Sequence, residues 1–261
     1  MIPAFRPGAR PGRLDARRAF RHPVAMQQTT PTARRNFHGR RHGKALRPAQ
    51  RRYLAEDLSR LAVPGVRPEE NPARAPIDPR TLFPGAADIW LEIGFGAGEH
   101  LHALAGEHPE IGFLGAEPFV NGVAALLGRL RAEPRGNIRL HAGDVRDLMD
   151  VLPAASLGRA YLLYPDPWPK ARHHKRRFVT PGHLVPLARA MRPGAELRLA
   201  TDIEDYLRQA LEELPAAGFE PADPHAPVSL TPWSGWPGTR YEAKALREGR
   251  RPHYLIVRNA G

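Results

Sequence analysis

The chain of 261 residues contains no cysteine, which excludes disulfide bonds, thiolate zinc sites and a cysteine nucleophile. It also lacks any apolar run close to the eighteen or so residues that a membrane span requires. The first thirty residues contain no apolar segment of the signal-peptide type. We therefore expect a soluble, cytoplasmic protein without membrane association, and we assign no metal site.

Acidic residues are scarce in the first part of the chain. Residues 1–52 carry fourteen Lys or Arg and a single acid, Asp15, whereas the rest carries 25 basic and 26 acidic residues. The net charge of +12 therefore comes from the N-terminal part. Residues 1–35 are rich in Arg, Pro and Ala without periodic apolar positions, which predicts a disordered basic arm attracted to RNA. A mitochondrial transit peptide is the alternative, but serine enrichment and an amphipathic repeat are missing.

The remaining chain divides into an extension at 36–84 and a main domain at 85–261. Within the extension, Tyr53, Leu54, Leu58 and Leu61 recur at helical spacing, so we expect a short helix followed by a Pro-rich connector. In the main domain, short apolar runs alternate with helical segments, which predicts a doubly wound, Rossmann-like α/β fold with a mostly parallel seven-stranded sheet. Strands are expected at 88–95, 111–117, 137–142, 158–164 and 196–201, with a late hairpin pair near 219–223 and 253–258. Helices are expected at 98–107, 119–132, 144–151, 181–191 and 203–214.

The first predicted strand runs into the glycine loop of LEIGFGAGEH. Gly94, Gly96 and Gly98 follow an E-x-G-x-G-x-G spacing, which differs from the dinucleotide fingerprint G-x-G-x-x-G. A ligand without phosphates needs close backbone approach at the glycines, and carboxylates for its amino and hydroxyl groups. The spacing favours such a ligand over NAD, and a turn that only packs strand against helix is the alternative.

Acids follow successive predicted strands, where ligands of such sheets bind. Glu117 stands where an acid can accept both ribose hydroxyls of NAD or of S-adenosylmethionine. Asp144 either accepts the exocyclic amine of an adenine or caps the next helix. The series of Glu92, Glu117, Asp144 and Asp166 favours a ligand role for all four.

The stretch YPDPWPKARHHKRR (164–177) surrounds Asp166 with prolines. These prolines forbid ladder continuation and restrict the residues before them, so we expect a stiff extended turn. Trp168 either stacks on a base or packs under the loop. The basic run behind it is either a solvated face or a phosphate-binding surface, and its place beside Asp166 favours RNA contact. The run comprises Lys170, Arg172, His173, His174, Lys175, Arg176 and Arg177.

Two later segments end in acids. Asp202 follows the fifth predicted strand and either binds a ligand or caps a helix. Glu204 and Asp205 are first-turn acids that the helix dipole explains. The segment TRYE (239–242) joins a hydroxyl, a cation, an aromatic ring and an acid, and its local pattern alone leaves it unassigned.

As a set, these residues resemble the bacterial tRNA (guanine-N7)-methyltransferase family, TrmB. LEIGFGAG, GAE, YPDPWPKARHHKRRFV, ATD and TRYE occur in the family's order and spacing, and NFHGRRHGK with the following PAQ resembles its N-terminal segment. The resemblance runs from about Asn36 to the C-terminus, and its most specific part is the PDPWPK-x-RH-x-KRR block. Three departures are Tyr164 in place of phenylalanine, Arg240 in place of lysine, and Trp236 where an arginine often precedes the proline.

The resemblance implies a class I S-adenosylmethionine-dependent methyltransferase fold and methyl transfer to a guanosine in the tRNA variable loop. It implies a donor site with Glu92, Glu117, Asp144 and Asp166 beside Gly94, Gly96 and Gly98, with Asp166 as the catalytic residue. It also implies a substrate site formed by Lys170, Asp202, Thr239, Arg240, Tyr241 and Glu242, and RNA contact by residues 172–177.

Guanine N7 carries a free lone pair, so the proposed reaction needs placement more than a strong base. Asp166 and a second acid, Asp202 or Glu242, would accept hydrogen bonds from guanine N1–H and the N2 amine. Two other classes are weighed against this one. A non-catalytic RNA-binding module is disfavoured by the intact series of acids, and an NAD-dependent dehydrogenase by the glycine spacing.

Overall fold

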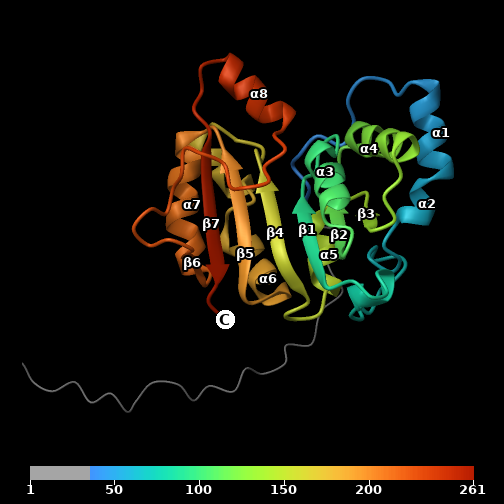
Figure 1. Cartoon of the computed structure of the whole chain (residues 1–261), viewed down its shortest axis with the longest axis horizontal. Helices are drawn as coiled ribbons and strands as arrows, with labels where there is room; N and C mark the ends of the chain where they lie inside the picture. Colours follow the sequence, from blue (N-terminus) through green and yellow to red (C-terminus); the bar gives the residue numbers. More distant parts are fainter. Residues whose placement is uncertain (1–35) are drawn as a thin grey trace, which may run out of the picture. The chain divides into compact units, whose positions relative to one another are not determined.

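One seven-stranded sheet forms the centre of the computed structural model, which describes residues 36–261 (Figure 1). The strand order is β3-β2-β1-β4-β5-β7-β6. Strands β1 to β5 are parallel, and β7 pairs antiparallel with both β5 and β6. The predicted arm at 1–35 lies outside the described residues. The strands are β1 Asp88–Ile93, β2 Ile111–Ala116, β3 Ile138–His141, β4 Leu157–Leu163, β5 Met191–Thr201, β6 Phe219–Pro221 and β7 His253–Asn259.

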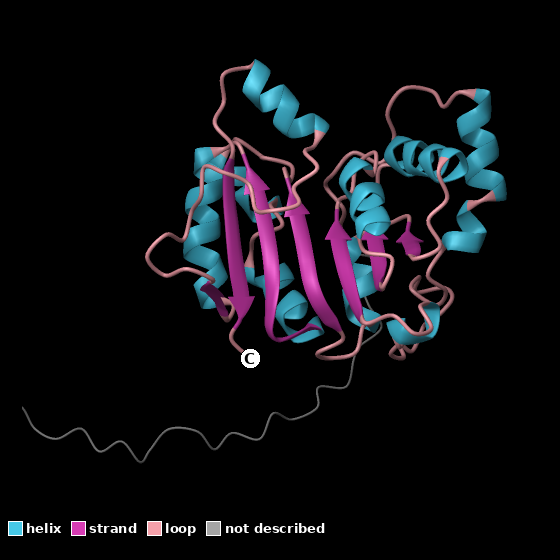
Figure 2. Ribbon diagram, in the orientation of Figure 1, coloured by secondary structure: helices cyan, strands magenta, loops and turns pink. Residues whose placement is uncertain are grey.

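Helices cover both faces of the sheet (Figure 2). Leu91 and Ile93 of β1 point into a core shared with α5, α6 and α7, whereas Trp90 points into a second core shared with α3 and α4. Side chains alternate across a strand, so a strand buried on both faces is apolar at nearly every position. The helices are α3 Glu99–Glu107, α4 Val120–Ala132, α5 Val145–Val151, α6 Pro181–Ala190 and α7 Glu204–Ala216. The predicted doubly wound fold is therefore confirmed.

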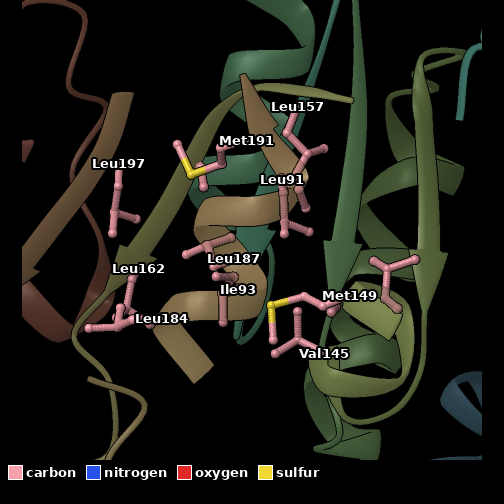
Figure 3. Packing of buried hydrophobic residues seen from close by; sticks show 14 of the residues in the cluster. Leu91, Ile93, Val145, Met149, Leu157, Leu162, Leu184, Leu187, Met191 and Leu197 are labelled. Atoms are coloured by element: carbon pink, nitrogen blue, oxygen red, sulfur yellow. The ribbon is translucent and has the colours of Figure 1, made fainter. Parts of the chain in front are cut away.

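The first core is closely filled by aliphatic side chains (Figure 3). Met149 of α5 and Leu187 of α6 pack beside Leu91 of β1, and all three are at most 1% exposed. Burial of one such side chain stabilises the fold by roughly 1.5–3 kcal/mol. This core fixes the strands whose carboxyl ends carry the predicted site.

The extension contains two short helices where the sequence predicts one. They are α1 Pro48–Glu56 and α2 Leu58–Leu61, separated at Asp57. Arg131 of α4 donates from Nε to the Asp57 carboxylate at 2.5 Å, and Tyr53 packs against Gly128 of α4. This tertiary ion pair lies at the break between the two helices. A 3₁₀ turn, η1 Pro79–Leu82, lies in the Pro-rich connector.

The structure differs from the prediction in the start of β5 and in two helical segments that the sequence did not predict. β5 begins at Met191 and pairs with β4 through a register shift, so Pro193 and Gly194 lie inside the strand. A 3₁₀ helix, η2 Ala171–Arg176, carries most of the basic run, and α8 Arg240–Arg247 carries most of TRYE. Figure 1 shows α8 beyond the carboxyl ends of β4 and β5. In the part of the chain that the structure describes, no helix is long and apolar enough to cross a membrane.

Candidate active site

A cavity of about 890 Å³ opens at the carboxyl ends of the parallel strands. Gly94 and Gly96 follow β1, Glu117 follows β2, and Asp166 follows β4, and all four line it. Asp144, after β3, lines it as well. Three of the four predicted carboxylates therefore meet in one cavity, at the place where sheets of this kind bind their ligands. The volume suits a nucleoside-sized ligand.

The three loop glycines have different surroundings. All three have positive φ values, 70° at Gly94, 55° at Gly96 and 72° at Gly98, which favour glycine. A Cβ on Gly94 would meet no atom within 4 Å, whereas one on Gly98 would lie 2.6 Å from Leu126 of α4. Gly98 is also absent from the cavity lining. Gly94 and Gly96 thus serve the cavity, and Gly98 packs the loop against a helix, which was the alternative interpretation.

Glu117 is buried, and backbone amides fix its carboxylate. Gly96 N–H donates to Oε2 at 2.6 Å and Phe119 N–H donates to Oε1 at 2.8 Å. Burial raises the pKa of Glu117 to about 7, although these two hydrogen bonds oppose the shift, and the neighbouring Asp166 adds to it. The carboxyl group therefore changes its charge near neutral pH in a fixed orientation.

Asp144 caps α5 and also lines the cavity. Its Oδ1 accepts from Arg146 N–H at 3.0 Å, and its Oδ2 accepts from Arg146 Nε at 2.9 Å. Burial alone would raise the pKa of Asp144, but the hydrogen bonds from Arg146 outweigh it, so the pKa lies below its ordinary value. Arg146 also donates to the carbonyl oxygen of Asn36 at 3.1 Å. The helix-cap interpretation is correct, and it leaves a charged carboxylate at the cavity wall.

Glu92 lies outside the lining of the cavity. Its carboxylate is buried and pairs with His100 Nδ1 at 2.7 Å, on the side of the sheet that α3 covers. The other ring nitrogen of His100 is buried without a hydrogen-bond partner among the described residues. Glu92 is thus not one of the carboxylates that line the cavity, although its charge acts on the neighbouring Glu117.

The loop that carries Asp166 is held by Arg177. Its guanidinium donates to the carbonyl oxygen of Pro167 at 2.8 Å and to the Asp205 carboxylate at 2.7 Å. Arg177 is 1% exposed, so it cannot contact RNA on this surface, and the sequence-based assignment of Arg177 as an RNA contact is corrected accordingly. Asp166 is accessible to solvent within the cavity, where partial burial by surrounding protein raises its pKa and Arg40 opposes the rise.

Trp168 packs within the basic run. The Arg176 guanidinium lies 5.1 Å from the Trp168 ring centre, and His173 meets the ring edge-on at 5.9 Å. Lys175 and Arg176 line the cavity, and His174 contacts the Asp205 carboxylate at 3.1 Å. The exposed members of the run are Lys170, Arg172 and Lys175.

The predicted substrate residues have separate partners. Asp202 accepts from Arg250 Nε at 2.5 Å, and Arg240 Nε donates to Glu99 at 2.7 Å. Thr239 Oγ1 caps α8 by accepting from Glu242 N–H at 3.1 Å. Among these residues, Tyr241 lines the cavity, where its ring would contact a Cβ on Gly96 at 3.3 Å.

Neither helix α8 nor the contribution of the N-terminal extension to the cavity wall was predicted from the sequence. Thr239 and Glu242 form an S/T-x-x-E pattern, which is typical of helix N-termini and could have predicted α8. Residues 36–40 also line the cavity, and the carbonyl oxygen of Arg41 accepts from Val120 N–H of α4 at 2.9 Å. No local pattern in NFHGRRHGK indicates that contact. Among residues 36–261, no group of three or more His, Asp or Glu could hold a metal ion.

Residues 86–255 match a family described as "Putative methyltransferase". The chain is 60% identical over 227 residues to the tRNA (guanine-N(7)-)-methyltransferase of Paracoccus denitrificans (strain Pd 1222), which spans 86% of this chain and 95% of that protein. It is 49% identical over 228 residues to the protein of the same name from Brucella anthropi, which spans 84% of this chain and 93% of that protein.

A solved structure has a similar fold. The 16S rRNA methyltransferase KamB aligns with a TM-score of 0.54 at 16% identity, and the alignment covers 70% of this chain and 92% of KamB. At that identity the likeness concerns the fold alone. The fold is that of class I S-adenosylmethionine-dependent methyltransferases, as the resemblance implied.

Proposed function

Because the chain belongs to the tRNA (guanine-N(7)-)-methyltransferase family, we propose that it transfers a methyl group from S-adenosylmethionine to N7 of a guanosine in the tRNA variable loop. The observation that supports this most is the meeting of Glu117, Asp144 and Asp166 with the glycine loop in one cavity.

The cavity residues fit the donor chemically. The open side of Gly94 allows close backbone approach, the fixed Glu117 carboxylate can accept from ribose hydroxyls, and Asp144 can accept from the adenine amine. When bound, the donor would supply an electrophilic methyl carbon to the N7 lone pair, and the electrons of the broken carbon–sulfur bond would remain on sulfur. Donor binding by Glu92 stays a prediction, because its carboxylate lies outside the lining.

The guanine that receives the methyl group would be oriented by two carboxylates, which accept hydrogen bonds from its N1–H and its N2 amine. Asp166, accessible in the cavity, is the first. Asp202 is paired with the Arg250 cation, whereas Glu242 is held by the neutral N–H of Trp236 and the neutral O–H of Tyr254. Glu242 therefore keeps an uncompensated charge, so we favour it as the second acceptor. A nearby carboxylate would also stabilise the positive charge that methylation leaves on the purine.

The tRNA backbone would meet the exposed cations beside the cavity. Lys170, Arg172 and Lys175 are exposed, and Arg176 lines the rim over Trp168. Cations at these positions would bind the phosphates that flank the target nucleotide. Arg177 does not belong to this surface, because it is buried.

Methyl transfer from labelled S-adenosylmethionine to two tRNA transcripts tests the function. One transcript carries guanosine in the variable loop and the other carries adenosine at that position. We expect label only on the first, released as 7-methylguanosine. Label on neither transcript, despite donor binding in calorimetry, would contradict the proposed substrate. The alternative, a non-catalytic RNA-binding module, requires that calorimetry show no donor binding at all.

A further inference from the structure

Two aromatic side chains hold the carboxylate of Glu242 from outside α8. The indole Nε1–H of Trp236 donates to Oε2 at 2.8 Å, and the hydroxyl of Tyr254 on β7 donates to Oε1. Glu242 follows the cap residue Thr239, but its side chain does not turn back to the helix end as a capping box would require. The Glu242 carboxylate instead accepts hydrogen bonds from Trp236 and Tyr254.

These aromatic residues belong to a packed cluster. The Trp236 ring meets Trp233 at 4.9 Å and 81°, and it meets Tyr254 at 5.9 Å and 74°. On its other side it lies 5.2 Å from the ring of His100, which binds Glu92. Edge-to-face aromatic pairs have defined geometry, so the indole N–H that reaches Glu242 is itself held in direction.

The cluster adjoins the cavity. Tyr241, which precedes Glu242, lines it, and so does Tyr164. Burial, with Tyr254 and the charge of Glu242 beside it, raises the pKa of the Tyr164 hydroxyl. Glu242 itself is not among the lining residues, but its charge acts on the hydroxyl of Tyr164, which is.

Neutral donors leave the carboxylate capable of further binding. Each Glu242 oxygen accepts one hydrogen bond from Trp236 or Tyr254, and a carboxylate has about four acceptor positions. Neither donor is a cation, in contrast to the Arg250 that pairs with Asp202. The arrangement fixes the direction of the carboxylate and preserves its charge.

Resting on the proposed function, we propose that Trp236 and Tyr254 are positioning residues that aim the Glu242 carboxylate at the Watson–Crick edge of the acceptor guanine. They do not touch the substrate in this proposal. Their effect on the reaction passes through Glu242, so it depends on the presence of that carboxylate.

Substitution of the two tryptophans separates positioning from packing. Trp236→Phe keeps a ring but removes the N–H that Glu242 accepts. Trp233→Phe is the matched control, since Trp233 packs in the same cluster while Glu242 accepts from Trp236 and Tyr254. We expect Trp236→Phe to lower kcat for guanosine-containing tRNA about tenfold, the size of one lost hydrogen bond to a charged group. Trp233→Phe should change kcat less than about twofold, and calorimetry should show unchanged donor affinity in both variants.

A double-mutant cycle tests whether the effect passes through Glu242. In a Glu242→Gln background, Trp236→Phe should change kcat less than about twofold, because the carboxylate that it orients is already gone. A full tenfold loss in that background would overturn the proposal, and so would equal losses for Trp236→Phe and Trp233→Phe.

The indole signals give a readout that does not require activity. The four tryptophans give four indole N–H resonances, and Trp236→Phe assigns the one of interest. That resonance should move when Glu242 becomes Gln, and an unmoved resonance would overturn the proposal. The wild-type methyl-transfer assay reports separately on the proposed function: if the wild-type protein leaves guanosine unlabelled, that function fails, whatever the indole resonance shows.

Discussion

Two carboxyl groups around one cavity have pKa values shifted in opposite directions, because burial outweighs hydrogen bonding at Glu117 and hydrogen bonding outweighs burial at Asp144. Glu117 accepts only from backbone amides, and burial raises its pKa to about 7. Asp144 lines the same cavity, but hydrogen bonds from Arg146 keep its pKa below the ordinary value. The hydrogen bonds from Arg146 thus keep Asp144 charged at a pH where Glu117 titrates.

Donor affinity should therefore depend on pH through Glu117. Ribose hydroxyls donate to the ionised carboxyl group, whose fraction rises as the pH passes the folded-state pKa of about 7. We expect the affinity to increase between about pH 5.5 and pH 8, approaching tenfold per unit below pH 7, with proton release on binding. Calorimetry in two buffers of different ionisation enthalpy measures both. In Glu117→Gln the affinity should be lower and independent of pH; the same pH dependence in that variant would contradict the assignment.

Asp166 should matter more for turnover than for donor binding. Asp166→Asn keeps the size of the side chain but removes the charge that would orient the guanine and stabilise the methylated purine. We expect kcat to fall on the order of 100-fold, with donor affinity changed less than about threefold. Single-turnover methyl transfer and calorimetry provide the comparison. Equal losses in both would indicate that Asp166 is only a donor ligand.

At the scale of elements, the loop after β4 depends on a contact from η2 back to the loop. Tyr164 and Trp168 have positive φ values of 48° and 40°, which are rare for residues other than glycine. Arg177 holds the carbonyl oxygens of Pro167 and Trp168 from the far end of η2. The buried arginine therefore compensates for an unfavourable backbone conformation.

Lys175 and Arg177, at the end of η2, should differ in their effect on stability when replaced. Arg177→Met leaves two loop carbonyl oxygens without their donor and the buried side chain without its ion pair to Asp205, so the free energy of unfolding should fall by about 3 kcal/mol. Lys175→Met, at an exposed position, should change it by less than about 0.5 kcal/mol. Denaturant titration measures both.

The exposed cation should instead affect RNA affinity. Lys175→Met should make the slope of log affinity against log salt less steep by about one unit, because one phosphate contact is lost. An unchanged slope for Lys175→Met, together with a fully stable Arg177→Met, would reverse the roles assigned to these two residues.

At the scale of the whole molecule, most of the net positive charge lies in the N-terminal part. Residues 1–35 contain eight arginines and one acid, Asp15. Among the described residues, 36–261, the cavity is lined by the start of the extension and by the main domain. Charge and proposed reaction site can therefore be separated by truncation.

Removal of residues 1–35 should weaken tRNA binding without abolishing methyl transfer. We expect a less steep salt dependence of tRNA affinity, because fewer cations neutralise phosphates. At saturating tRNA, kcat should stay within about twofold of the full chain. A full-length variant with the eight arginines replaced by glutamine serves as the control for chain length. Loss of S-adenosylmethionine binding in the truncated protein would contradict the prediction that residues 1–35 act only on tRNA binding.

The sequence alone determined the fold class and most of the cavity. Alternation of apolar runs with helical segments is a local signal, and the parallel connection of such units follows from chain handedness. Because carboxyl ends of parallel strands share one edge, the sequence places Glu117, Asp144 and Asp166 together. These predictions needed only spacing along the chain.

Only the tertiary structure decided what each polar side chain contacts. Arg177 and Lys175 are alike in sequence, yet one is buried against a loop ten residues earlier and the other is exposed. Glu92 and Glu117 both follow apolar strand residues, yet only Glu117 reaches the cavity. Such partners come from distant segments, for example Trp236 and Tyr254 on either side of Glu242. Burial and hydrogen bonding depend on the three-dimensional packing of these segments, which no local pattern of residues contains.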